Sequence, residues 1–117
     1  MKYLISLLMA LTVSAVTVLP AQATGEFMTG RILKVGLEGF VSETSDELVR
    51  DAIAFGYVIG VHDALSGTLI CSGDEVTQGL VIQAVLQYMR AHPETLDNSA
   101  DTVVVAALKG VWPCRKT

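Results

Sequence analysis

The sequence has few of the residues from which catalytic and metal sites are built. It contains two histidines and two cysteines, with no Cys-x-x-C pair and no His-rich cluster, so a metal or redox centre is not indicated. It also lacks a glycine-rich phosphate loop. We therefore expect no cofactor, and the missing chemistry favours a binding protein over an enzyme.

Basic residues are also scarce. Eight Lys and Arg stand against twelve Asp and Glu, and the formal net charge of the 117 residues is −4. The basic residues are scattered, without a run or interleaved aromatics, so nucleic acid and anionic membranes are poor partners for this surface, and neither is expected to bind. An acidic surface would instead attract a basic protein partner.

The N-terminus has the pattern of a secretory signal peptide. Lys2 precedes an apolar run at 3–19, and the Ala-Gln-Ala at 21–23 has the small-x-small form of a cleavage site. Seventeen apolar residues are short for a membrane span, although an uncleaved signal anchor is the alternative. We predict a signal peptide at 1–23 and one mature periplasmic domain at 24–117, with no membrane contact after cleavage.

The only two cysteines, Cys71 and Cys114, allow a single pairing. Export permits a disulfide, and a domain of this size buries too little surface for a large core. The chain-entropy model gives roughly 4 kcal/mol for closing a loop of about 43 residues. A structural disulfide is therefore predicted.

The remaining pattern predicts an all-α fold, a small four-helix domain. Thr29 can cap a first helix that ends near Leu37, because Gly36 and Gly39 weaken its continuation. Phe27 is placed to pack back on this helix as a hydrophobic staple.

A second helix is predicted over 48–65, started by a capping box of Thr44 and Glu47. Its small residues recur at every fourth position and form a shallow strip along one side. The strip serves either close packing inside the monomer or self-association, as in a homodimer: Ala52, Gly56, Gly60 and Ala64.

The third helix is expected to carry Asp74 and Glu75 in its first turn and to end at Pro93. The fourth begins after Asn98 or Ser99, and its 3.6-residue period outweighs the strand alternative at 102–105.

Gly110 and Pro113 close the fourth helix, and Trp112 is expected to plug the core beside the disulfide. The bridge would then tie the end of the fourth helix to the start of the third.

A catalytic arrangement is disfavoured. His62, Asp63 and Ser66 could form a His-Asp-Ser set on paper, but neighbouring helical residues point about 100° apart, so His62 and Asp63 should not face each other. His92 at a helix end is read as a dipole-stabilised surface residue.

Short matches in order and spacing across nearly all of the mature chain resemble the Rap/Tai family of type VI secretion immunity proteins. They are FMTG at 27–30, IL at 32–33, GYVIGV at 56–61 and DA at 63–64, then Cys71, VTQ at 76–78, VLQY at 85–88 and AHPE at 91–94, and finally Ala100, Val103, AL at 107–108 and WPC at 112–114. The resemblance implies an exported, helical, non-catalytic protein that protects a bacterium from peptidoglycan amidases delivered by sibling cells.

The family commonly carries two further cysteines, and those positions hold Gly36 and Ala54 here. Both are absent together, as expected if a whole bridge is missing.

The resemblance also implies inhibition by occlusion, in which a dimer pushes a loop or helix end into the amidase groove. The candidate contacts are polar residues of two loops: Ser72, Gly73, Asp74 and Glu75, then Glu94, Thr95, Asp97 and Asn98. For each loop, plain solvated turns with capping acids are an equally good reading.

An HdeA-like periplasmic acid-stress chaperone is the alternative. Such chaperones are also small, exported and helical with one disulfide, and protonation of the twelve acids at low pH would be their trigger.

Overall fold

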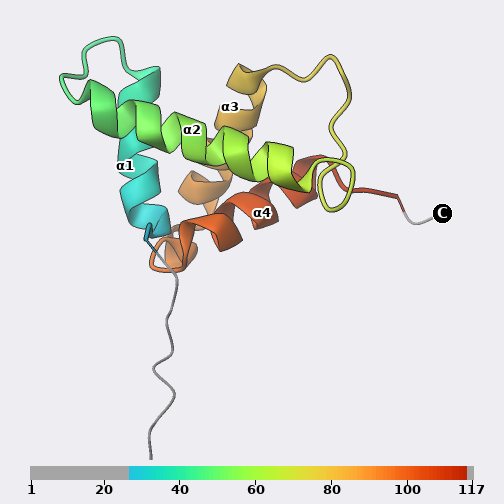
Figure 1. Cartoon of the computed structure of the whole chain (residues 1–117). Helices are drawn as coiled ribbons and strands as arrows, with labels where there is room; N and C mark the ends of the chain where they lie inside the picture. The colour runs from blue at the N-terminus through green and yellow to red at the C-terminus, as the bar shows by residue number, and fades with distance from the viewer. Residues whose placement is uncertain (1–26, 116–117) are drawn as a thin grey trace, which may run out of the picture.

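The computed structural model describes residues 27–115, and the predicted signal peptide lies outside this range. Within this range the chain forms four α-helices joined by loops and one 3₁₀ turn after the third helix, and Figure 1 shows how the helices are arranged. They are α1 (Gly30–Val41), α2 (Leu48–Leu65), α3 (Gln78–Ala91), η1 (Pro93–Thr95) and α4 (Ala100–Val111). The described residues contain no strand, so the all-α prediction is confirmed and the strand alternative at 102–105 is wrong.

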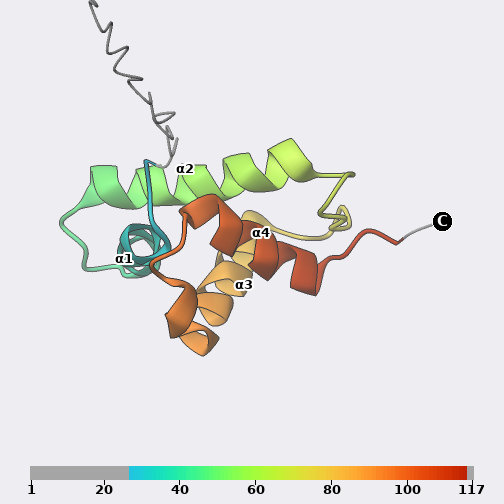
Figure 2. The ribbon, with the colours of Figure 1, turned by 90° about the horizontal axis from the view of Figure 1, so that it is seen from below.

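The longest helix, α2, runs along one edge of the protein. The other three helices all lie on one side of it, which Figure 2 shows most clearly. The core lies between α2 and these helices and is made of aliphatic side chains, among them Leu33, Leu37, Val58, Ile70, Ile82, Val85, Met89, Val104 and Leu108. The opposite side of α2 is covered by none of the described helices.

Helix α1 begins as predicted, but it is longer than predicted. The Thr29 hydroxyl accepts from Ile32 N at 3.3 Å, and the helix continues four residues beyond Leu37 to Val41. The glycines that suggested an early end are contact points with α2. A Cβ on Gly36 would lie 2.5 Å from Ala54 Cβ, and one on Gly39 would overlap the Asp51 carboxylate. Close helix contact therefore offsets the low helix propensity of glycine.

Gly36 and Ala54 are also the two positions at which the family resemblance implies a further disulfide. They face each other directly across the α1–α2 contact. The two helices approach here more closely than a disulfide allows, since Cβ atoms joined by a bridge are about 3.8 Å apart. Close backbone packing is therefore found at the two positions where the resemblance implies a second disulfide.

The two predictions about helix starts near α1 and α2 are wrong. Phe27 is 98% exposed and forms no staple. Glu47 occupies the N-cap position of α2, but its side chain forms no hydrogen bond with the first turn of the helix. Thr44 and Glu47 therefore do not form a capping box. The Thr44 hydroxyl pairs instead with Ser42, and the Ser45 hydroxyl accepts from Glu47 N at 3.2 Å.

Helix α3 starts later than predicted. Thr77 caps it by accepting from Leu80 N at 3.2 Å, so Asp74 and Glu75 lie in the preceding loop and not in the first turn. The sequence offered two acids that suit a helix N-terminus, but the Thr77 hydroxyl supplies a direct cap three residues further on. The predicted end is confirmed, because α3 stops at Ala91 before Pro93.

The predicted disulfide between Cys71 and Cys114 is present, with a Cα–Cα distance of 4.9 Å. Cys71 N donates to Trp112 O at 2.9 Å beside it, and Trp112 packs half-buried against the core. Because α3 begins only at Gln78, the bridge ties the end of α4 to the segment after α2, and not to the start of α3 as predicted.

Candidate partner-binding surfaces

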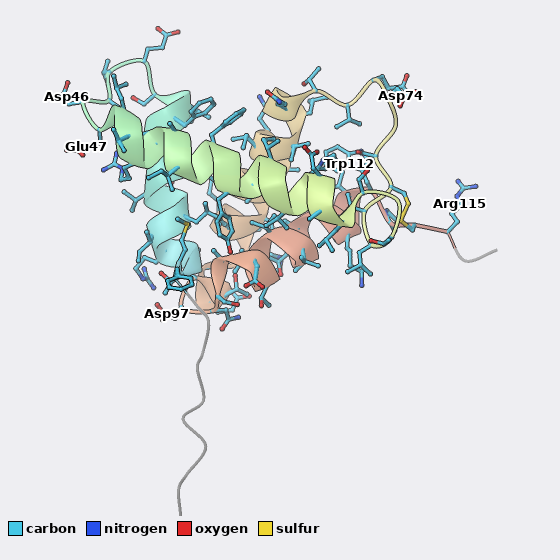
Figure 3. All side chains as sticks on the ribbon, viewed as in Figure 1. Asp46, Glu47, Asp74, Asp97, Trp112 and Arg115 are labelled. Atoms are coloured by element: carbon cyan, nitrogen blue, oxygen red, sulfur yellow. A yellow bond between two sulfur atoms is a disulfide. The ribbon has the colours of Figure 1, made fainter. Side chains whose placement is uncertain are left out.

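The first candidate loop, residues 72–75, directly follows Cys71 of the disulfide and lies at one corner of the protein (Figure 1). Gly73, Asp74 and Glu75 are exposed, and Ser72 is half-buried. Val76 N donates to Gly73 O at 3.1 Å, which closes a tight turn beneath the two acids. Figure 3 shows Asp74 at the outer edge of this loop, pointing away from the helices. The loop is therefore both acidic and accessible.

This first loop is attached to α2 by a histidine. His62 Nε2 lies 2.8 Å from Ser72 Oγ, and His62 Nδ1 lies 2.9 Å from Asp63 Oδ1. An imidazole that donates from Nδ1 to a carboxylate can accept a hydroxyl proton at Nε2. The expectation that His62 and Asp63 do not face each other is wrong, because their side chains bend together over the short distance. Ser72, and not Ser66, is the hydroxyl partner, and only the fold brings it to the helix.

The second candidate loop, residues 93–98, is engaged within the protein. Gly30 N donates to Asn98 O at 2.9 Å, and Arg31 N donates to Leu96 O at 2.7 Å. Asp97 forms an ion pair with Arg31 at 2.9 Å. The loop thus holds the start of α1 against the α3–α4 turn.

Thr95 and Glu94 of the same loop also have internal partners. The Thr95 hydroxyl donates to His92 O at 2.8 Å. A backbone N–H of Glu94 itself, followed by the His92 side chain, holds the pKa of the Glu94 carboxyl below its ordinary value. The polar residues that made this loop a candidate in the sequence are therefore mostly engaged in contacts within the protein.

The two candidate loops lie far apart. In Figure 3, Asp74 and Asp97 mark opposite ends of the protein, and Figures 1 and 2 separate the two segments in the same way. The two loops are therefore separate candidate surfaces.

A third acidic loop joins α1 to α2, and sequence reasoning missed it as a surface. Glu43, Asp46 and Glu47 are exposed there (Figure 3 labels the last two). Below it, a hollow of about 380 Å³ is lined by Phe40, Leu48 and Asp51, among others.

Asp51 is the buried charge of this region, at 3% exposure. The Ser45 hydroxyl donates to its carboxylate, and Arg50 Nη2 pairs with it at 2.8 Å. The Ser45 hydrogen bond, more than the Arg50 charge, lowers the pKa of the Asp51 carboxyl, against the opposing effect of burial. A sequence signal existed, because Asp51 falls in line with the buried Ala54 and Val58 on the helical period.

The strip of small residues on α2 faces outward. Ala52, Gly56, Gly60 and Ala64 are all exposed, and a Cβ added to either glycine would meet no heavy atom within 4 Å. Close packing inside the described part of the monomer therefore does not explain the strip. Self-association is the reading of the two that stays open.

Within residues 27–115 no helix is both long and apolar enough to cross a bilayer. The same residues bring no three His, Cys, Asp or Glu side chains together in a group that could hold a metal ion.

The chain matches one family model, described as Rap1a immunity proteins, over residues 35–114. The match begins inside α1 and ends at the second cysteine of the disulfide, and it spans well over half of the chain. No curated protein matches the sequence. The family match agrees with the resemblance carried by the sequence motifs, and the chain belongs to the Rap1a immunity protein family.

Proposed function

We propose that this chain is a type VI secretion immunity protein that binds a peptidoglycan amidase toxin in the periplasm and occludes its active site. The observation that carries the proposal is the family match over residues 35–114. Immunity proteins of this family are typically non-catalytic and bind a partner effector protein. The amidase as target, the periplasm and cleavage after Ala23 are parts of the proposal.

The first loop, residues 72–75, is the better candidate for the inhibitory contact. Its two acids are exposed, and neither has the kind of internal role that Asp97 and Asn98 have in the second loop. An acidic turn fixed at its base by a disulfide loses little conformational freedom on binding, which favours affinity. Such a loop suits a groove lined by basic residues.

The His62, Asp63 and Ser72 chain is proposed to hold this loop in place and not to catalyse a reaction. Its hydrogen-bond order resembles that of a Ser-His-Asp triad. However, the Asp63 side chain is 72% exposed, whereas the acid that orients a catalytic histidine is normally buried. The same contacts are explained if His62, held by Asp63, fixes Ser72 and thereby the first loop to α2. We call this hydrogen-bonded set the latch, and it serves the proposed binding by holding the loop in place.

The proposal is tested by protection from lysis. Candidate amidases, beginning with any encoded beside this gene, are exported to the periplasm of a bacterial host with and without the full-length chain. The chain should prevent lysis by its cognate amidase, and the purified pair should form a stable complex by calorimetry. Failure to protect against any amidase exported with type VI machinery from the same genome would contradict the proposal.

The loop assignment is tested with matched charge reversals. Asp74→Lys with Glu75→Lys should abolish protection, because both changes place positive charge on the proposed contact. Asp97→Lys in the second loop is the control, which breaks only the exposed Arg31 pair and should retain protection. The opposite pattern would move the inhibitory contact to the second loop.

One further measurement, suppression of protein aggregation at pH 2, distinguishes an immunity protein from the acid-stress chaperone alternative. An immunity protein should not suppress the aggregation of unrelated proteins at pH 2, whereas an HdeA-like chaperone should do so without a genetic partner. The family match favours the first outcome.

A further inference from the structure

The hollow beneath the α1–α2 loop has an apolar wall that is open to solvent. Its volume is about 380 Å³, and the apolar side chains that line it are Phe40, Leu48 and Ala52. Phe40 is 44% exposed and Leu48 is 73% exposed, although both side chains are large. Large apolar side chains that stay exposed around a hollow are typical of a surface that binds another molecule.

The Phe40 ring is supported from within the protein and remains accessible from the hollow. The rings of Phe40 and Phe55 are stacked, with centroids 4.4 Å apart and planes inclined by 19°. Because Phe40 also lines the hollow, the ring surface that Phe55 leaves uncovered can be reached from there. The face of an aromatic ring carries partial negative charge and attracts a cation placed over it.

The rim of the hollow is acidic. Glu43 lines it, and Asp46 and Glu47 are exposed on the same loop. None of these three carboxylates has an ion-pair partner among the described residues. The neighbouring cation, Arg50, pairs with Asp51 at 2.8 Å, so these two charges offset each other. The three loop acids are therefore uncompensated and would attract a positive group.

The loop that carries these acids is held by hydrogen bonds of its own. The Ser42 hydroxyl accepts from Thr44 N at 3.3 Å, and the Ser45 hydroxyl accepts from Glu47 N at 3.2 Å. The Ser45 hydroxyl also donates to the buried Asp51 carboxylate. A loop fixed in this way loses little conformational freedom when a partner binds.

A planar cation on an apolar stem matches the apolar wall, the ring and the acids together. The guanidinium group of arginine stacks on aromatic rings and pairs with carboxylates, while its methylene stem packs on apolar surface. The lysine ammonium is more strongly hydrated and has no planar face. We infer that this hollow is a socket for an arginine side chain of the partner protein, with the guanidinium over Phe40 and against Glu43 and the stem beside Leu48. The inference rests on the proposed function for the identity of the partner, and not for the socket itself.

The socket and the first loop can contact the same partner. In Figure 3, Asp46 and Asp74 lie along the same edge of the protein, near opposite ends of α2, and Asp97 lies away from both. Helix α2 has 18 residues and is therefore about 27 Å long. A standard interface patch of roughly 800 Å² per partner is wide enough to span this length. The amidase would then meet the first loop and the socket at once.

The first experiment needs no toxin. N-acetyl-arginine amide is titrated into the purified chain with its disulfide intact, and the backbone amide signals are followed by NMR. The amides of residues 39–52 should shift along a saturable curve in the millimolar range, as expected for a ligand of so few atoms. N-acetyl-citrulline amide, which has the same shape without the charge, should bind at least about tenfold more weakly.

Matched variants test the residues of the socket. Phe40→Leu keeps an apolar side chain without the ring, and Glu43→Gln removes one charge, so each should weaken binding of N-acetyl-arginine amide at least about threefold. Leu48→Ala should also weaken it, because the stem loses its apolar contact. Val49→Ala is the matched control and should bind like the wild type, because Val49 is 75% exposed but does not line the hollow.

Three results would overturn the inference. Equal binding of the citrulline compound would show that charge has no part in recognition. Shifts at residues 72–75 as large as those at 39–52 would show only a general attraction of cations to acidic loops. Unchanged binding in correctly folded Phe40→Leu and Glu43→Gln variants would place the ligand elsewhere.

The cognate amidase separates this inference from the proposed function. Glu43→Gln with Leu48→Ala should lower the affinity for that amidase at least about tenfold by calorimetry, whereas Val49→Ala should leave it unchanged. Full affinity in the double variant would contradict the inference and leave the proposed function standing. Binding of N-acetyl-arginine amide in a chain that protects against no amidase would contradict only the proposed function.

Discussion

The two ends of α2 are fixed to the rest of the protein in different ways. The N-terminal end crosses α1, where Gly36 meets Ala54 and Gly39 meets the Asp51 carboxylate, without any covalent link. The C-terminal end runs into a loop that contributes one large buried side chain, Ile70, and is closed by the Cys71–Cys114 disulfide.

The difference shows where a small domain needs a covalent bond. Two helices that cross at glycines bring their backbones together and exclude water without help. A loop cannot do this, because its backbone stays at the surface and buries little apolar area. The disulfide in the loop and the glycines at the helix crossing thus both compensate for the small apolar area that a domain of this size can bury.

The largest expected effect comes from removing the disulfide that follows the C-terminal end of α2. Cys71→Ser with Cys114→Ser should lower the free energy of unfolding by roughly 4 kcal/mol, because the unfolded chain regains the freedom of a long loop. That loss is close to the whole net stability of some small domains. Urea unfolding of the variant, and of the wild type with and without reductant, measures it. A loss below about 1 kcal/mol would show that packing alone holds both ends.

The second prediction tests the glycine crossing. Gly39→Ala should destabilise the protein by roughly 1–3 kcal/mol, because its methyl group would overlap a carboxylate that Ser45 and Arg50 hold in place. Gly110→Ala is the matched control in α4, where nothing lies within 4 Å, and should stabilise by up to about 1 kcal/mol. Thermal unfolding of both variants decides the matter. Equal shifts would mean that the close contact at Gly39 has no energetic importance.

The third prediction concerns pH. The pKa of Asp51 is lowered in the folded protein from an ordinary value of 3.8, so its carboxylate stabilises the fold above that pH and loses this effect as the pH falls through the folded pKa. Asp51→Asn should therefore be less stable than the wild type at neutral pH, with the difference closing below pH 3.8. Denaturant unfolding between pH 7 and pH 2 follows it. Glu94→Gln, at an exposed site, should show the same sign and a smaller effect.

The smallest effect is expected at the latch of the first loop. His62→Ala removes the contact with Ser72, so backbone amides of residues 73–77 should exchange with solvent faster. Global stability should change by less than about 1 kcal/mol, as is usual for one partly exposed hydrogen bond. Ser66→Ala is the control and should leave the exchange unchanged. If amide exchange were unchanged in the His62 variant, the contact between His62 and Ser72 would not hold the first loop in place.

Much of the fold could be predicted from the sequence. The span of α2, the end of α3 at Pro93 and the pairing of the two cysteines follow from local rules, because helical periodicity, proline geometry and cysteine number do not depend on distant residues. The end of α1 could not be predicted in the same way. Gly36 and Gly39 have the composition of a helix end, and only their partners on α2 make them helical.

The site was less accessible to sequence reasoning than the fold. The polarity of both candidate loops is visible in the sequence. The contact between the second loop and α1 is not, because it joins Arg31 and Asp97, which lie far apart in the chain. The pairing of His62 with Ser72 spans ten positions and depends on the path of the loop between them. The outward direction of the strip depends on which side of α2 the other helices cover.

The disulfide also bears on the time at which this protein can become native. For a chain exported as we propose, the cytosol keeps thiols reduced, and a small domain without its bridge has little stability to spare. The precursor would then remain loosely folded and competent for threading through a translocation channel. Oxidation on the far side would complete folding only where the toxin arrives.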